Sequence, residues 1–234
     1  MVTLICFALK EEAAPFHRIA AQHPGVITLT VGIGHASAEK SIRSFLGGAG
    51  KPPELVLTCG FAGGLNPDLK LGDVVFEIPS RSSRGNEAQT EIGNHGNQLE
   101  PPHVGCYEKL VAADAKPVKF FCADRIATTV AEKKKLRAET GADAVEMESA
   151  AIHAVCAERG IPCATVRVIS DTADEDLPLD FNALAKPDKS LDYGKLFLAV
   201  AKSPGKIGSL MRLQKKTKFA AAQLAVALEK IISP

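Results

Sequence analysis

The chain has 234 residues, of which 46% are hydrophobic and 24% charged, the composition of an ordinary soluble globular protein. The formal net charge is +1, so charge gives no reason to expect nucleic acid or an acidic membrane as the main partner. Tryptophan is absent and aromatic residues make up 5%, which argues against a stacking platform for single-stranded nucleic acid. No apolar run reaches the ~20 residues of a membrane span, and the first residues lack the features of a signal peptide. A cytoplasmic protein is therefore expected.

The cysteines and histidines show no metal-binding spacing. No two cysteines form a C-x-x-C pair, and most lie in apolar runs, which favours reduced core cysteines over disulfides or metal ligands. We therefore expect neither a metal nor a cofactor. The cysteines are Cys6, Cys59, Cys106, Cys122, Cys156 and Cys163.

Apolar runs of strand length alternate with segments of helical periodicity along most of the chain. In chain order they predict a strand at 2–9, a helix at 11–22, a strand at 26–31, a helix at 35–46, a strand at 55–58, a glycine-rich loop at 60–64 and a strand at 74–78. A long irregular segment at 80–103 precedes a strand at 118–122, a helix at 129–139, a strand at 144–147, a helix at 148–158 and a strand at 163–169. The remainder, about 191–232, is expected to be helical with a break at Pro204-Gly205. This alternation predicts an α/β fold in which residues 1–234 form one domain around a parallel or mixed sheet.

The segment 144–174 is the candidate active site. Glu146-Met147-Glu148 and Ser170-Asp171 each close an apolar run, and one crossover helix joins the two runs. Burying a carboxylate at the end of a core element costs desolvation free energy, so carboxylates at such positions are candidates for a role in binding or catalysis. Both ends are therefore expected to open into one cleft.

Four segments in order resemble the purine/uridine phosphorylase superfamily, and within it the 5′-methylthioadenosine/S-adenosylhomocysteine nucleosidases. They are ALKEE at 8–12, GFAGGL at 60–65 with GDVV at 72–75, VEME at 145–148 and VRVISD at 166–171. The resemblance implies a central mixed β-sheet that curls into a barrel and is flanked by helices. It also implies cleavage of the N-glycosidic bond of a small-molecule nucleoside, and a homo-oligomer (a dimer, trimer or hexamer) in which a neighbour's loop closes the site. We expect a dimer, and we expect the irregular segment 80–103 to be that loop.

The resemblance assigns three carboxylates to three tasks. Asp171 matches the acid that protonates the purine at N7, and burial at a strand end is expected to raise the pKa of such a carboxyl. The alternative is an N-cap for the following turn. Glu148 matches the carboxylate that binds the ribose hydroxyls, the alternative being a first-turn glutamate that stabilises the helix dipole. Glu12 matches the residue that activates the attacking water, the alternative being a solvated helical turn at Glu11-Glu12.

Further positions carry supporting roles. Met147 would pack on the sugar or simply fill the core, Glu146 would orient its neighbours, and Arg167 would pair with Glu148 or Asp171 or belong to a separate ion pair. The glycine-rich loop would bring backbone close to the sugar, and Ile126 would contact the base. The substrate-binding residues expected from the resemblance are Glu148, Met147, Glu146, Ser170, Ala62, Gly63, Phe61, Ile126, Ala127 and Arg167.

Departures from the family pattern keep alternatives open. Phe61 replaces a serine that touches the nucleophile or ribose, and Ile126 stands where an aromatic residue stacks on adenine. The expected reaction is hydrolysis of 5′-substituted adenosines with release of adenine. Because Lys10 could attract an anion, phosphorolysis, with phosphate in place of water as co-substrate, stays an alternative, and Phe61 would favour a nucleoside-binding protein without turnover.

The segment from Leu191 to Leu213 contains KSPGKI at 202–207 and LMRL at 210–213. It resembles the hopanoid-biosynthesis-associated branch of the superfamily, which suggests adenine release from adenosylhopane as a further alternative. The C-terminal piece 216–232 is amphipathic, with basic residues on its polar face. Such a helix could visit a membrane surface, but a helix that covers the core is favoured.

Overall fold

The computed structural model describes residues 2–48, 50–77, 109, 111–112, 114–184 and 204–233. The predicted 80–103 loop, Cys106 and the first part of the tail, 191–203, lie outside these residues. Within the described ranges, no helix combines the length and the hydrophobicity that crossing a membrane requires.

An eight-stranded mixed sheet forms the centre of the described part of the chain, which confirms the predicted α/β class. Its path is β2-β1-β3-β8-β4-β5, and β7 pairs with both β3 and β6. The pairings among the described strands do not close the sheet into a ring, so the curl into a barrel stays a prediction. The strands are β1 (Thr3–Phe7), β2 (Val26–Thr30), β3 (Leu55–Gly64), β4 (Val74–Phe76), β5 (Lys116–Pro117), β6 (Phe120–Cys122), β7 (Ala144–Glu146) and β8 (Cys163–Asp171).

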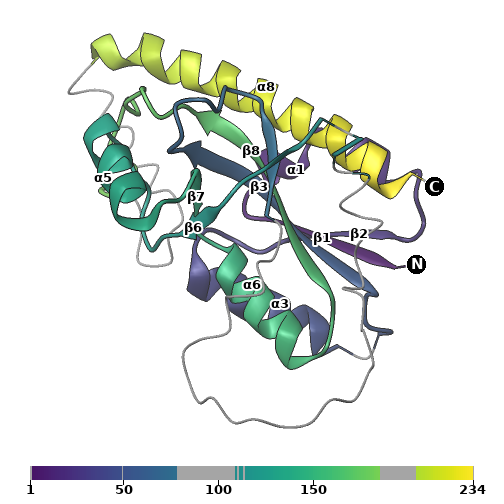
Figure 1. Cartoon of the computed structure of the whole chain (residues 1–234). Coiled ribbons are helices and arrows are strands. Elements are labelled where there is room, and N and C mark those ends of the chain that lie inside the picture. Colours follow the sequence, from purple (N-terminus) through teal and green to yellow (C-terminus); the bar gives the residue numbers. More distant parts are fainter. Residues whose placement is uncertain are drawn as a thin grey trace, which may run out of the picture.

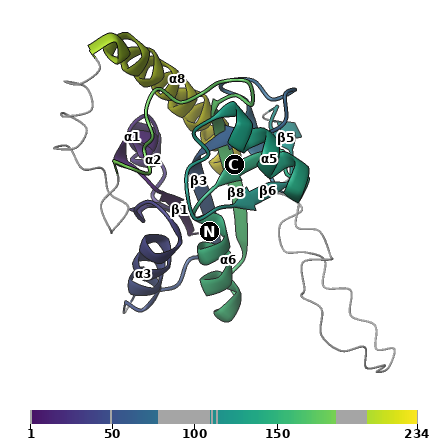
Figure 2. The ribbon, with the colours of Figure 1, turned by 90° about the vertical axis from the view of Figure 1, so that its left-hand side faces the viewer.

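Helices cover both faces of this sheet (Figure 1). The long α8 lies across one face, and α3 and α6 lie together on the other (Figures 1 and 2). Apolar side chains of α8 pack with β1, β3 and β8, whereas α3 and α6 enclose a second core against β1 and β3. Burial on both faces explains why these strands read as continuous apolar runs. The helices are α1 (Lys10–Ala13), α2 (His17–Ala20), α3 (His35–Leu46), α5 (Val130–Thr140), α6 (Ser149–Glu158) and α8 (Ile207–Ile232), preceded by a 3-10 turn at Pro204–Lys206.

Two predicted elements differ from the structure. The helix expected at 11–22 is two short helices, α1 and α2, because Pro15 between them has no backbone N–H to continue the hydrogen-bonding pattern. The glycine-rich segment expected as a loop is instead the second half of β3. It stays extended because β8 pairs with it up to Gly63 and β7 pairs with Gly63 and Gly64. These ladder hydrogen bonds outweigh the low strand propensity of glycine.

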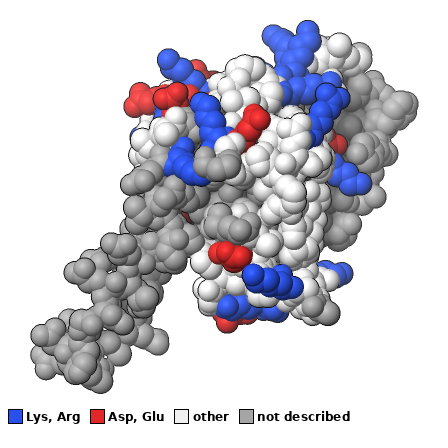
Figure 3. Space-filling model, turned by 90° about the vertical axis from the view of Figure 1, so that its right-hand side faces the viewer, with Lys and Arg blue, Asp and Glu red and all other residues white. Residues whose placement is uncertain are grey.

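The tail agrees with its prediction in outline. Pro204-Gly205 marks the break as a 3-10 turn, and α8 then runs without interruption to Ile232. One face of its second half, from Ala220 to Ile231, is buried, so this part of the helix covers the core as favoured. Its first half carries the exposed apolar side chains Ile207 and Met211. On the face in Figure 3, Lys and Arg form separate groups around a largely uncharged centre and no continuous basic surface.

The strand pairing around β3 creates the site. β1 runs parallel to β3 and ends at Phe7 beside Cys59, whereas β7 runs antiparallel to β3 from its far end. Because β8 occupies the other edge of β3, β1 and β7 share one edge and run towards each other. Their carboxyl ends therefore meet beside Gly60 and Phe61, where the chain turns into α1 and α6.

Candidate active site

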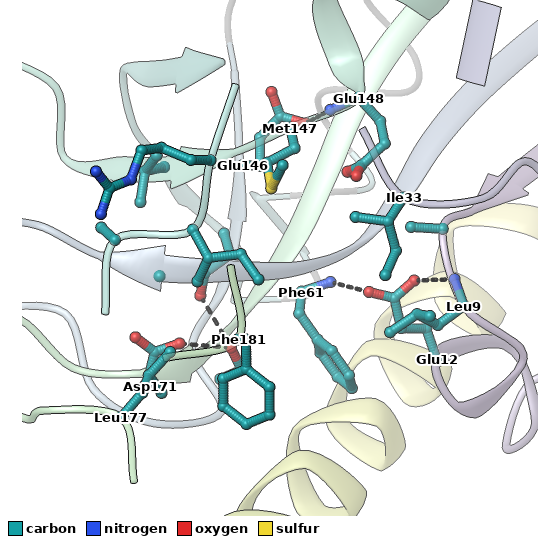
Figure 4. A pocket seen from close by; sticks show the side chains of 18 of the residues that line it. Leu9, Glu12, Ile33, Phe61, Glu146, Met147, Glu148, Asp171, Leu177 and Phe181 are labelled. Carbon is teal, nitrogen blue, oxygen red and sulfur yellow. Dashed lines mark hydrogen bonds between the residues drawn. The ribbon is translucent and has the colours of Figure 1, made fainter. Parts of the chain in front are cut away.

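A cavity of about 200 Å³ opens where β1, β3, β7 and β8 present these ends (Figure 4). Carboxylates of Glu12, Glu148 and Asp171 lie around it, and the rings of Phe61 and Phe181 lie between Asp171 and Glu12 in this view. Every predicted site residue lines the cavity except Arg167. The lining comprises Ala8, Leu9, Glu12, Ile33, Phe61, Ala62, Gly63, Arg125, Ile126, Ala127, Val145, Glu146, Met147, Glu148, Ser170, Asp171, Leu177, Phe181 and Leu213.

Glu12 is a buried carboxylate held by backbone donors. Its Oε2 accepts the N–H of Leu9 at 2.9 Å, and its Oε1 accepts the N–H of Phe61 at 2.8 Å. Burial raises the pKa of Glu12 to about 7, although these hydrogen bonds and the charge of Arg167 oppose the rise. Glu11 is exposed while Glu12 is only 3% exposed, so the solvated-turn alternative is wrong for Glu12. A carboxyl that titrates near neutrality is suited to accept a proton from water.

Gly60 makes this arrangement sterically feasible. Its φ of +145° is a conformation that side-chain-bearing residues rarely adopt. A Cβ at this position would lie 2.8 Å from Arg167 Nη1 and 2.8 Å from Glu12 Oε1. Because Gly60 has no side chain, the Arg167 guanidinium and the Glu12 carboxylate can lie directly against β3.

Arg167 and Glu146 form a buried pair behind the cavity. Arg167 Nη2 lies 2.5 Å from Glu146 Oε2, and its side chain is 1% exposed. Glu146 also accepts hydrogen bonds from the backbone N–H groups of Glu148 and Ser149 and from the Ser149 hydroxyl. Burial alone would raise the pKa of Glu146, but Arg167 and these donors outweigh burial and hold the pKa below its ordinary value. These hydrogen bonds connect Glu146 to the start of α6, and its role in orienting site residues stays a prediction.

Glu148 projects from the N-terminus of α6 towards the cavity. Its Oε1 accepts the N–H of Gly34 at 2.9 Å, and its Oε2 lies 3.4 Å from Arg167 Nη1. Burial raises the pKa of Glu148 above its ordinary value, although Arg167 opposes the rise. Arg167 therefore pairs with both Glu146 and Glu148, and its described contacts do not extend to Asp171. A carboxylate fixed in this way can accept hydrogen bonds from two neighbouring hydroxyls.

Asp171 ends β8 at the opposite end of the cavity. Its Oδ1 accepts a hydrogen bond from Lys133 Nζ at 2.5 Å, and its Oδ2 accepts one from the Ser170 hydroxyl at 2.8 Å. These donors are side chains, so the contacts give no support to the N-cap alternative.

Apolar side chains cover the rest of the cavity. Met147 is buried and lines it, so its side chain fills the core and faces the site. Ile126 is clamped by Asn182, whose side chain accepts the Ile126 N–H at 2.9 Å and donates to the Ile126 carbonyl at 2.9 Å. Phe181 lies next to this clamp and supplies an aromatic ring. The site therefore keeps an aromatic wall although Ile126 is aliphatic.

The sequence analysis missed several residues of the site. Gly34 follows a predicted strand, and its position at a strand end was the one signal that could have placed it near Glu148. Phe181 comes from a segment without a motif, and Leu213 lies in the tail, where the resemblance assigned no site residue. Lys133 is one of three consecutive lysines in a polar helix, so the sequence pattern does not indicate that its side chain is buried.

Metal binding finds no support in the described part of the chain. There, no group of three or more His, Cys, Asp or Glu side chains is arranged to hold a metal ion. None of the five described cysteines forms a disulfide.

Comparisons with known proteins agree with this geometry. The family model described as "Phosphorylase superfamily" matches residues 10–190. A 5′-methylthioadenosine/S-adenosylhomocysteine nucleosidase of Shewanella halifaxensis is 32% identical over 180 residues, which cover 70% of this chain and 76% of the relative. The chain therefore belongs to the phosphorylase superfamily, as its motifs predicted.

Solved structures share the fold. The futalosine hydrolase of Helicobacter pylori superposes with a TM-score of 0.65 at 20% identity, covering 99% of this chain and 97% of that one. The 5′-methylthioadenosine/S-adenosylhomocysteine nucleosidase of Neisseria meningitidis, solved with methylthio-immucillin-A, gives 0.65 at 18% identity, covering 99% and 98%. The likeness of the tail to the hopanoid-associated branch stays a prediction.

Proposed function

We propose that this protein hydrolyses the N-glycosidic bond of 5′-substituted adenosines and releases adenine. Glu12 carries the proposal, because a buried carboxyl with a pKa of about 7 can act as a general base at neutral pH. The nucleosidase of Shewanella halifaxensis, 32% identical, supports the reaction class.

The charge of the cavity favours water over phosphate as the nucleophile. Among the described lining residues, Glu12, Glu146, Glu148 and Asp171 are acidic and Arg125 is the one basic residue. Arg125 is mostly exposed and pairs with Glu132. Lys10, which could have attracted phosphate, is exposed and does not line the cavity. A phosphate dianion beside Glu12 would be repelled.

The proposed reaction divides between the two ends of the cavity. At one end, Asp171 delivers a proton to N7 of the purine as the glycosidic bond breaks, and it is left as a carboxylate. At the other end, Glu148 holds the ribose hydroxyls, and its charge lies near the oxocarbenium-like sugar. Glu12 takes a proton from the attacking water, whose oxygen bonds to the anomeric carbon. The products are adenine and the free sugar.

The apolar side of the cavity supports an apolar 5′ substituent. Leu9, Ile33, Phe61 and Leu213 line it, and none of these side chains offers a hydrogen bond. Methylthioadenosine suits such a surface, and futalosine is a second substrate to test because a futalosine hydrolase shares the fold.

Adenine release tests the proposal. The protein is incubated with methylthioadenosine, with and without phosphate, and adenine, free sugar and sugar 1-phosphate are measured. Free sugar without phosphate supports hydrolysis. Strict phosphate dependence with sugar 1-phosphate would remove Glu12 from its role, and binding without adenine release would indicate a nucleoside-binding protein.

We propose further that the protein acts in the cytoplasm as a homo-oligomer, preferably a dimer. The cysteine pattern supports the first statement, and the family resemblance supports the second. Light scattering on the full-length chain measures the oligomeric state directly, and a monomer at all concentrations would contradict the second statement.

A further inference from the structure

Lys133 is the single buried residue of α5 among those the structure describes, and its side chain is 0% exposed. The neighbouring Lys134 and Lys135 are exposed, as expected for a polar helix. An apolar side chain would hold a helix at this position at a lower desolvation cost than an ammonium. The choice of a lysine therefore calls for a reason other than packing.

The three protons of the Lys133 ammonium are all used. Nζ donates to Asp171 Oδ1 at 2.5 Å, to the Thr172 carbonyl at 2.7 Å and to the Glu175 carbonyl at 2.9 Å. The Glu175 carboxylate is bound by Lys216 at 2.6 Å instead. Asp171 is thus the carboxylate to which the charge of Lys133 is directed.

The start of α5 is fixed to the segment that follows Asp171. The backbone N–H of Val130 donates to Asp176 Oδ1 at 2.6 Å, and the N–H of Leu177 donates to the Thr128 carbonyl at 2.8 Å. Glu132 closes a capping box with Thr129 at the same place. These contacts on both sides of Lys133 restrict where its ammonium can lie.

The carboxylate of Asp171 has little room to turn. Ser170 holds Oδ2, and a Cβ added to Gly63 would lie 3.3 Å from Oδ1. Under the proposed function, on which this inference rests, Asp171 becomes an anion as it protonates the leaving base. A fixed positive charge beside that oxygen stabilises the anion as it develops, which lowers the barrier to bond cleavage and does not require contact with the substrate.

We infer that Lys133 is a positioning residue for catalysis: it orients Asp171 and stabilises the carboxylate that proton donation leaves behind. It acts on the chemical step through Asp171. Its loss should therefore lower kcat far more than it changes KM, and only when residue 171 can ionise.

The test is a double-mutant cycle in the full-length protein with methylthioadenosine as substrate. Lys133→Met should lower kcat by about 10- to 100-fold with KM within about threefold of the unsubstituted value. In an Asp171→Asn background the same substitution should lower kcat by less than about threefold, because asparagine forms no carboxylate. Lys134→Met is the matched control and should leave kcat unchanged.

Other outcomes overturn the inference. Equal factors in both backgrounds, or a kcat equal to that of Lys134→Met, would show that Lys133 does not act through Asp171. Thermal unfolding checks that each variant is folded, and Lys133→Gln, which keeps donors for the carbonyl groups, is the second neutral variant. If neither variant folds, Lys133 is a structural residue and the inference fails. A wild-type chain that releases no adenine would instead contradict the proposed function.

Discussion

The backbone N–H of Phe61 donates a hydrogen bond to Glu12 Oε1 at 2.8 Å across 49 positions of sequence. The family serine at position 61 would add a hydroxyl here, but the orientation of Glu12 rests on the main chain, which Phe61 retains. The main-chain donor therefore leaves the carboxylate in place, and the contact to the nucleophile or ribose that the resemblance assigns to the serine stays an expectation.

Replacement of Asp171 should leave binding largely intact and impair bond cleavage. Asp171→Asn removes the proton for N7 while keeping the size of the side chain, so turnover should fall by roughly 10²–10⁴-fold. Adenine release from methylthioadenosine under saturating substrate measures the effect. Near-normal turnover would remove Asp171 from the mechanism.

The pH dependence should reflect Glu12. A general base must be ionised, and the pKa of Glu12 is raised to about 7, so kcat/KM should fall by about tenfold per pH unit below pH 7. Initial rates between pH 5 and pH 9 measure this limb. A rate that stays level down to pH 5 would show that Glu12 is not the group that titrates.

The same shift makes a separate prediction for stability. The folded state binds the Glu12 proton more tightly than the unfolded state, because its pKa rises from 4.5 to about 7. This contribution is fully present below pH 4.5 and is lost as pH rises through 7; it amounts to about 3 kcal/mol. Glu12→Gln should remove it, so the difference in unfolding free energy between the two proteins should change between pH 4.5 and 8. A constant difference in urea titrations would contradict the raised pKa.

Gly60 should tolerate no side chain. Gly60→Ala places a Cβ 2.8 Å from both Arg167 Nη1 and Glu12 Oε1 at a φ of +145°. We expect a loss of about 1–3 kcal/mol in unfolding free energy, together with a loss of activity. Gly208→Ala is the control, since among the described residues no atom outside its own stretch of helix lies within 4 Å of its Cβ position. Equal unfolding free energies of the two variants would contradict the steric strain expected for Gly60→Ala.

Much of the fold follows from apolar runs in the sequence. β1 and β8 are buried on both faces, so their residues read as continuous strands, and His35–Leu46 forms the helix that its pattern predicts. The glycine-rich half of β3 could not be predicted in this way, because its conformation depends on pairing with strands far along the chain. Local propensity gives no information on such partners.

The residues of the site likewise differ in whether the sequence alone reveals them. Glu146, Glu148 and Asp171 stand next to apolar runs, which made them recognisable. Lys133 is different, because a run of three lysines does not reveal which one is buried. The direction of a side chain on α5 depends on how that helix packs, and only the structure shows this.

The most direct test of the account is the reaction of methylthioadenosine in phosphate-free buffer with the unsubstituted protein and with Glu12→Gln. We predict free adenine and free sugar in equal amounts from the former, and turnover lower by roughly 10²–10⁴-fold from the latter. Sugar 1-phosphate formed only when phosphate is added, or equal hydrolysis by both proteins, would contradict the role of Glu12 and with it the proposed hydrolysis.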